Sequence, residues 1–307
     1  MADTGVLARG VRRRFATVEA LSGLDLDVPY GEVTALVGPN GAGKTTLLLI
    51  LATLLAPDSG EVRIAGIDPV ADAEAVRARM GWMPDTFGVY DQLITREYLE
   101  FFCEAYRIPR DQARARVSEL LELVHLPEFA DRPVHVLSRG QKQRLGVARA
   151  LVHRPKVLLL DEPAAGLDPR SRVELRDLLR AQAAEGVAVL VSSHILSELE
   201  EIADRVVFVD RGVAVSDRRV GELGTATESE FRVRALDNEA LVAALTRRAV
   251  PYEAPAAASE VRVRVASESA AADLLSGLVA DGVRVIGFAP VGSQLESAYL
   301  AFTEERS

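Results

Sequence analysis

The chain has 307 residues, is 49% hydrophobic and carries a formal net charge of −9. This length leaves room for two domains, and the apolar share suffices for packed cores, which excludes a disordered chain. The acidic balance argues against a nucleic-acid-binding protein, because such proteins present a basic surface. No apolar run reaches the roughly 18 residues of a membrane-spanning helix, and the N-terminus lacks the apolar stretch of a secretory signal. We therefore expect a soluble chain that is not exported.

The first two thirds of the sequence alternate short β-rich runs with helical stretches, which predicts an α/β layer fold. Strands are expected at residues 32–38, 60–66, 156–163, 187–194 and 204–212. Between about 91 and 155 the strands stop, and apolar residues recur at helical spacing in 95–108, 112–124 and 139–153. A mainly helical subdomain is therefore expected there. The single cysteine, Cys103, falls in this apolar pattern and is expected to be buried.

A small polar segment, 223–230, reads as a linker between a domain at 1–222 and an accessory α/β domain at 231–307. In the accessory domain we expect strands at 231–236, 260–266 and 283–290, and helices at 238–250 and 270–282. A final helix opens with Ser293 and Glu296, which are spaced as a capping box. This part has no histidine, no cysteine and no clustered carboxylates, so a dimerisation or regulatory module is expected.

The run "GPNGAGKTT" joins the strand expected at 32–38 to an apolar helix. Glycines let backbone N–H groups turn inward, and the helix that follows adds the positive end of its dipole, so the loop suits an anion. In the phosphate-binding pattern Lys44 reaches the β- and γ-phosphates and the Thr45 hydroxyl faces Mg²⁺. A tight turn that needs glycine only for its backbone is the alternative. The candidate ligands are Gly38, Pro39, Asn40, Gly41, Ala42, Gly43, Lys44, Thr45 and Thr46.

A second acidic element ends the strand expected at 156–163, where Asp161 and Glu162 follow "KVLLL". Neighbouring strand residues point to opposite faces, so the two carboxylates cannot serve the same purpose. Asp161 is placed to meet Mg²⁺, directly or through water, and Glu162 is placed to take a proton from the attacking water. The alternative is that Asp161 and Glu162 are only the polar end of a buried strand, which enters a turn at Pro163.

The order "GPNGAGKTT", "LSRGQKQRLGVARAL", "VLLLDEP", "AGLD" and "SSH" resembles the ATP-binding subunits of ABC transporters over roughly the first 220 residues. The resemblance implies a P-loop NTPase core with a helical insert, the cofactors ATP and Mg²⁺, and a head-to-tail dimer with a second copy or a homologous subunit. In such a dimer the signature element holds the partner's ATP. Its residues here are Ser138, Arg139, Gly140 and Gln141. Without this context "LSRGQ" reads as an ordinary helix cap, which is the alternative.

Three single residues match further positions of the family. His194 resembles the switch histidine that contacts the γ-phosphate and orients Glu162 and water. Phe15 resembles the aromatic residue that stacks on adenine, with a core aromatic at a strand end as the alternative. Asp168 resembles the aspartate that crosses the dimer interface, and it is also placed to cap the next helix.

Two residues depart from the family pattern. Asp85 stands where many of these ATPases have glutamine, and its shorter, charged side chain is still able to accept from metal-bound water. Arg139 stands where glycine is commonest. The Arg139 side chain either adds positive charge to a phosphate site, or points to solvent, or pairs with a partner's carboxylate. The sequence is compatible with all three arrangements.

The resemblance implies that ATP hydrolysis drives a separate polytopic membrane permease. It also implies that the chain is cytoplasmic and peripheral on the inner face of the membrane. Phe87, Tyr90 and Leu93 are the candidates for permease contact, with core packing as the alternative. The C-terminal unit resembles that of exporter subunits. The rival function is an ABC-type ATPase that acts on ribosomes or DNA, which the single "GKT" and the absence of sustained heptads disfavour. An inactive ATP-binding scaffold would require the loss of Glu162, Lys44 or His194, and all three are present.

Overall fold

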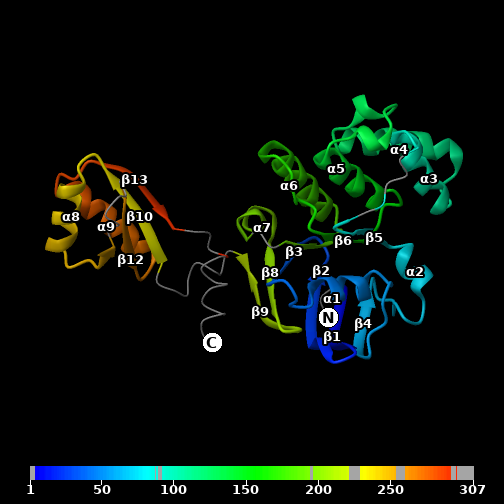
Figure 1. The fold of residues 1–307 in the computed structure, drawn as a ribbon, viewed down its shortest axis with the longest axis horizontal. Coiled ribbons are helices and arrows are strands. Elements are labelled where there is room, and N and C mark those ends of the chain that lie inside the picture. Colours follow the sequence, from blue (N-terminus) through cyan, green and yellow to red (C-terminus); the bar gives the residue numbers. More distant parts are fainter. Residues whose placement is uncertain are drawn as a thin grey trace. The chain divides into compact units, whose positions relative to one another are not determined.

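The computed structural model describes residues 4–86, 88, 92–193, 196–220, 229–253, 260–291 and 295. The chain divides into two compact units, Met1–Val220 and Gly221–Ser307, which we describe separately (Figure 1).

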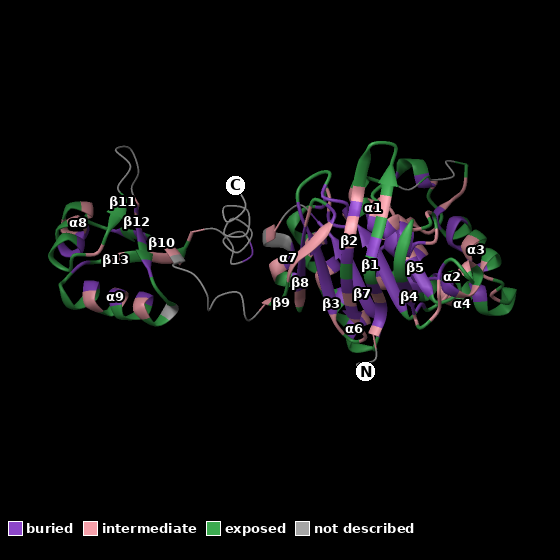
Figure 2. Ribbon diagram, turned by 90° about the horizontal axis from the view of Figure 1, so that it is seen from below, coloured by how far each residue is buried: buried purple, intermediate pink, exposed green. Residues whose placement is uncertain are grey.

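A six-stranded sheet forms the centre of the first unit, in the order β5-β6-β7-β3-β8-β9. The first five strands run parallel, and β9 is antiparallel to β8. Every residue of β3, β6 and β7 is buried, as expected for parallel strands covered on both faces (Figure 2). The bounds are Met80–Met83 for β5, Val157–Asp161 for β6, Ala188–Ser192 for β7, Val33–Val37 for β3, Arg205–Asp210 for β8 and Val213–Arg219 for β9.

A separate antiparallel sheet contains β2 (Val18–Pro29), β1 (Thr4–Phe15) and β4 (Ser59–Ile64). The strand expected at 60–66 is present as β4, but it belongs to this sheet and not to the parallel layer. Neither β1 nor β2 is among the strands predicted from the sequence. Helix α1 (Lys44–Leu51) shares one apolar core with both sheets, which includes Val6, Leu24, Leu48, Leu159 and Leu190.

The helical subdomain contains α3 (Thr95–Ala105), α4 (Arg110–Leu123) and α5 (Arg139–Ala150), with two short 3₁₀ turns between α4 and α5. The three helices predicted in this region are all present, and no strand occurs among the described residues between 92 and 155. Cys103 is buried in α3 as expected, and burial raises the pKa of its thiol. The remaining helices of this unit are α2 (Ala73–Arg77), α6 (Pro169–Ala184) and α7 (Leu196–Ile202).

The second unit has a four-stranded antiparallel sheet in the order β11-β12-β10-β13 and its own apolar core. Its strands and helices are β10 (Ser229–Ala235), α8 (Asn238–Arg247), β11 (Tyr252–Glu253), β12 (Val261–Val265), α9 (Glu268–Ala280) and β13 (Val285–Pro290). Ser293 and Glu296, which are predicted to open a final helix, lie outside the described residues. None of the helices in the described ranges has the length and apolar character that a membrane span requires.

Candidate functional site

The glycine loop leaves the carboxyl end of β3 and leads directly into α1. Two of its glycines are required by their surroundings. A Cβ atom on Gly38 would clash with the carbonyl oxygen of Val209, and Gly43, the N-cap of α1, has a φ of 107° in the left-handed region. The loop therefore comes close to the end of β8 and turns into the helix without side chains in the way.

Lys44, the first residue of α1, is almost fully buried beneath this loop. Its Nζ donates to the carbonyl oxygen of Gly38 at 2.6 Å and to that of Pro39 at 3.2 Å. Burial lowers the pKa of Lys44, and the charges of Glu162 and Asp161 oppose that shift. The ammonium group is thus held by the loop itself, close enough to the carboxylates of Asp161 and Glu162 to interact with their charge.

Asp161 is the buried last residue of β6, and Ser192 is the buried last residue of the adjacent strand β7. The Ser192 hydroxyl donates to Asp161 Oδ1 at 2.5 Å. Burial raises the pKa of Asp161 and the nearby Asp85 adds to this, while the Ser192 hydrogen bond and the charge of Lys44 act against it. One buried serine therefore fixes the orientation of this carboxylate.

Glu162 directly follows β6 and has a φ of 51°, in the left-handed region that non-glycine residues rarely adopt. Its backbone N–H donates to the hydroxyl of Ser192 at 3.1 Å and to the carbonyl oxygen of Ser192 at 3.2 Å. The strained backbone is thereby held in place, and it turns Glu162 out of the strand. The alternation of side chains along a strand, used in the sequence analysis, does not by itself set the direction of Glu162.

Ser192 is not among the site residues predicted from the sequence. It stands in "VSSH", where only the histidine attracted attention, and the available signal was a polar residue at the end of a wholly apolar run. Its importance follows from sheet order, because β7 lies between β6 and β3, and Ser192 pairs in register with both Asp161 and Leu36.

A cavity of about 770 Å³ lies over these elements and brings many of the predicted residues together. Val18 and Ala20 of β2 form part of its wall, and Trp82 and Pro84 form another. The predicted site residues that line it are Pro39, Asn40, Gly41, Gly43, Lys44, Thr45, Thr46, Asp85, Arg139, Asp161 and Glu162. Among the described residues no group of three or more histidine, cysteine or acidic side chains forms a protein-only metal site. Mg²⁺ is usually held by one or two carboxylates together with phosphate oxygens, so Asp161 and the Thr45 hydroxyl fit such an ion.

The other predicted residues lie elsewhere. Ser138 and Asp168 are exposed and do not line this cavity, nor do Gly140 and Gln141. Leu93 lines a different groove between α3 and α4. His194, Phe87 and Tyr90 fall outside the described residues.

Phe15 ends β1 and is 43% exposed, which excludes the core-aromatic alternative. The guanidinium of Arg13 lies over its ring, 4.9 Å from the centroid, and Arg13 is itself paired with Asp58 at 2.7 Å. Phe15 does not line the cavity, although Val18 and Ala20 of the following strand do. The ring therefore stands near one end of the cavity wall with part of its surface open to solvent.

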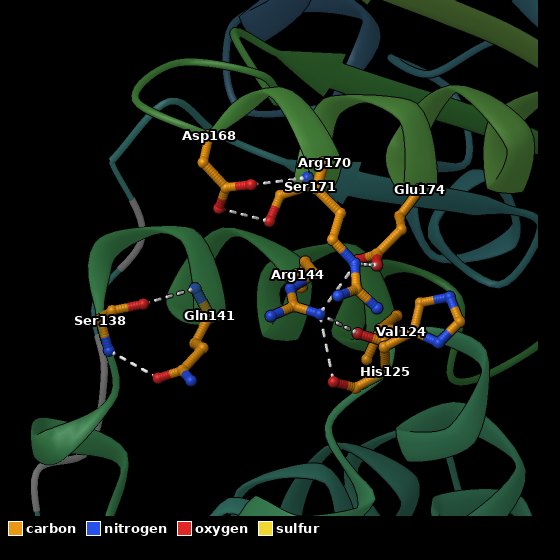
Figure 3. A network of polar contacts seen from close by, with 9 residues as sticks. All are labelled: Val124, His125, Ser138, Gln141, Arg144, Asp168, Arg170, Ser171 and Glu174. Carbon is orange, nitrogen blue, oxygen red and sulfur yellow. Dashed lines mark hydrogen bonds and ion pairs between the residues drawn. The ribbon is translucent and has the colours of Figure 1, made fainter.

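Ser138 and Asp168 each cap a helix (Figure 3). Ser138 Oγ accepts from the backbone N–H of Gln141 at 3.2 Å, and the Gln141 side chain accepts from the Ser138 N–H at 2.8 Å. Asp168 accepts from the N–H and the hydroxyl of Ser171, and these hydrogen bonds hold the pKa of Asp168 below its usual range. Both side chains are thus ordered by local caps and still reach the surface.

Arg144 connects these two capped helices (Figure 3). From α5, its NH1 contacts Glu174 of α6 at 3.3 Å and donates to the carbonyl oxygens of Val124 and His125 after α4. The Arg144 and Glu174 side chains are only 17% and 19% exposed. Glu174 also pairs with Arg170 at 3.0 Å. The helix that begins at Ser138 and the helix that begins at Asp168 are therefore held together by a largely buried ion pair.

A family model described as "ABC transporter" matches residues 21–165. The daunorubicin resistance ATP-binding protein DrrA3 of Streptomyces coeruleorubidus is 40% identical over 74% of this chain and 72% of its own length. The chain belongs to the family of ABC transporter ATP-binding proteins. An uncharacterised ABC transporter ATP-binding protein of Bacillus subtilis, YdbJ, is 32% identical and aligns with 99% of this chain and 96% of its own.

Solved structures of ABC ATP-binding subunits agree with this assignment. The ATP-binding subunit of an ABC transporter superposes with a TM-score of 0.67 at 27% identity, covering 72% of this chain and 92% of that one. A dimeric post-hydrolysis cassette, MJ0796 bound to ADP and Pi, gives a TM-score of 0.63 at 26% identity, with 70% and 98% covered. The predicted fold, an α/β ABC-ATPase core with a helical insert, is confirmed. The protein is an ATP-binding ATPase.

Proposed function

We propose that this ABC ATPase hydrolyses Mg²⁺-ATP to drive a separate membrane-spanning permease, and that the transport is export. The convergence of the glycine loop, Asp161 and Glu162 on one cavity carries the proposal. The ATPase domain is proposed to span 1–222, with a linker at 223–230 and an accessory module at 231–307.

The roles of the cavity residues follow from their positions. Lys44 and the loop N–H groups hold the β- and γ-phosphates, and the Phe15 ring stacks on adenine. Thr45 and Asp161 hold Mg²⁺, with Asp85 acting through a water. The ion, when bound, neutralises charge that develops on the phosphate oxygens. Glu162 accepts the proton of the attacking water, and His194 orients its carboxylate. Ser192 holds the carboxylate of Asp161 and the backbone N–H of Glu162.

A head-to-tail dimer would complete each site. Ser138 and Gly140 lie at the N-terminus of α5, where a hydroxyl and backbone N–H groups suit the partner's γ-phosphate. Asp168 lies at the N-terminus of α6 and is exposed, so it is available to cross the interface. The second subunit is either a copy of this chain or a homologous ATPase.

The proposal that transport is export rests on similarity to drug-resistance proteins. DrrA of Mycobacterium tuberculosis, a doxorubicin resistance ATP-binding protein, is 37% identical over 79% of this chain and 75% of its own. With DrrA3, it supports a drug exporter with this chain on the cytoplasmic face, held there by its permease. Among the described residues, the groove between α3 and α4 that includes Leu93 is the proposed contact surface for the permease.

The test uses a tagged Glu162→Gln variant expressed in its native cells, with membranes solubilised in the presence of Mg²⁺-ATP. We expect a stoichiometric polytopic membrane protein to co-purify and to be identified by mass spectrometry. Tagged Lys44→Ala, which weakens the hold on ATP, is the control for association that does not need the nucleotide. Ribosomes or DNA recovered in place of a membrane protein would support the rival class of non-transport ABC ATPase.

The same variant tests the chemistry. Purified Glu162→Gln should bind ATP like the wild type. Its turnover should be lower by a factor of about a hundred or more. Normal turnover would remove Glu162 from the role of base and leave the transporter proposal standing.

A further inference from the structure

The Phe15 ring stands beside the tight turn that joins β1 to β2. Phe15 is the last residue of β1 and pairs in register with Val18, the first residue of β2, and Val18 lines the nucleotide cavity. The ring is 43% exposed, so packing in the core does not fix its orientation. A ring that offers one flat face to a base binds more tightly when another group already holds it in place.

The guanidinium of Arg13 covers one face of this ring. Its central carbon lies 4.9 Å from the ring centroid, a distance at which a cation is attracted to the π-electrons. The Arg13 side chain is only 24% exposed, so water screens this contact less than it would on an open surface. The face of Phe15 that remains for a base is therefore the one opposite Arg13.

Asp58 fixes Arg13 in turn. Its Oδ1 accepts from Arg13 NH1 at 2.7 Å, and its Oδ2 accepts from the backbone N–H of Arg14 at 2.7 Å. The backbone N–H of Asp58 also donates to the carbonyl oxygen of Arg12 at 2.9 Å. Three hydrogen bonds thus join the segment that carries Asp58 to the end of β1, next to the ring.

The place of Asp58 in the chain connects this cluster to the phosphate loop. Asp58 lies between β4 and α1, and α1 begins at Lys44. The residue expected to hold the phosphates and the carboxylate that holds Arg13 are therefore at the two ends of one short stretch of chain. Most of that stretch is a helix packed in the core, which keeps the two ends in a constant relation.

We propose that Arg13 is a positioning residue for the base of ATP: held by Asp58, it keeps the Phe15 ring oriented toward the adenine. The inference rests on the nucleotide site proposed above, and it adds a group that acts through Phe15 without touching the nucleotide. Because the ring is ordered before the base arrives, less conformational entropy is lost on binding. The affinity for ATP therefore depends on Arg13, and the affinity for a triphosphate without a base does not.

The experiment measures the affinity of the full chain for ATP and for inorganic triphosphate by calorimetry, with Mg²⁺ removed by EDTA to prevent hydrolysis. Arg13→Met keeps the apolar stem and should weaken ATP binding about fivefold, with triphosphate binding unchanged. Arg13→Lys should retain part of the ATP affinity, because it keeps a cation beside the ring. Arg12→Met is the matched control. It removes the neighbouring arginine of β1, which pairs with Glu19 at 3.0 Å, and should change neither affinity.

A double variant tests whether Arg13 acts through the ring. Phe15→Leu alone should weaken ATP binding about tenfold, as expected for the loss of one stacked base. Adding Arg13→Met to Phe15→Leu should cause no further loss. Thermal unfolding at matched pH shows whether each variant is folded.

Three results would overturn the inference and leave the nucleotide site standing. They are an unchanged ATP affinity of Arg13→Met, an equal loss for ATP and triphosphate, and a further loss in the double variant. An unchanged ATP affinity of Phe15→Leu would remove the stacking role of Phe15 itself, and the inference with it. A folded wild-type chain that binds neither ligand would overturn the proposed nucleotide site, so these failures are distinguishable.

Discussion

The ion pair between Arg144 and Glu174 gives a prediction whose magnitude follows from the structure. In Arg144→Met the apolar stem is kept and the guanidinium is lost. The two carbonyl oxygens after α4 lose a donor, worth about 1 kcal/mol each. Glu174 loses a mostly buried partner but keeps Arg170, so the loss of this ion pair costs about 1 kcal/mol more. The substitution also removes the Arg144 Nε, a buried donor without a partner, and this removal stabilises the fold by about 1 kcal/mol. The expected net loss of stability is about 2 kcal/mol.

For a unit of this size, about 2 kcal/mol lowers the midpoint of thermal unfolding by roughly 4–8 °C. The midpoint is measured by circular dichroism on the full chain. Arg170→Met is the matched control, because Arg170 pairs with the same Glu174 but is 90% exposed, and exposed pairs contribute about 0–1 kcal/mol. Equal shifts in the two variants would refute the reasoning that burial makes the Arg144 contact valuable.

The same variant should separate binding from turnover. Neither Arg144 nor Glu174 lines the nucleotide cavity, so the affinity of a single chain for ATP should be unchanged. Turnover at saturating ATP should fall severalfold, since loosening α5 against α6 misplaces Ser138 and Asp168 with respect to the partner. The assay is run well below the unfolding temperature of the variant. A raised KM with an unchanged kcat would contradict this role.

Three further predictions concern the site and the fold. Ser192→Ala should lower kcat about tenfold with little change in KM, because it frees Asp161 and the backbone of Glu162. Lys44→Ala should abolish the thermal shift produced by Mg²⁺-ATP, and a shift equal to that of the wild type would count against the phosphate cradle. Burial lowers the pKa of His153 to about 4, so the unfolded chain takes up its proton first, and stability is lost as the pH falls from about 6.5 to 4. His153→Gln should flatten the decline in unfolding midpoint between pH 7 and 5, and His135→Gln should not.

The cavity was largely predictable because its main residues follow buried strands. Asp161 and Glu162 come directly after an apolar run, and parallel strands bring their carboxyl ends to one edge of the sheet. Ser192 was not predictable in the same way. Its role depends on the position of β7 between β6 and β3. The spacing of apolar residues does not predict the lateral order of strands in a sheet.

The long strands β1 and β2 escaped prediction for a local reason. Their pairing is interrupted by several register shifts, for example between Ala8 and Val11, and each shift breaks the period of two that identifies a strand. The segment "RGVRRRF" also places charged residues where alternation would require apolar ones. Arg13 and Arg12 find acidic partners on neighbouring segments, which only the folded sheet brings close.

The same loop that carries the proposed base also leads to the proposed dimer surface. Glu162 is held by two hydrogen bonds to Ser192, and the chain then passes under Arg139 at Gly166 before it reaches Asp168 and α6. A displacement of Glu162 when the γ-phosphate leaves would be transmitted along this short loop into α6. Because Glu174 ties α6 to α5, the displacement would also reach Ser138. In the proposed head-to-tail dimer, these contacts would connect the hydrolysis site of one chain to the surface proposed to hold the partner's nucleotide.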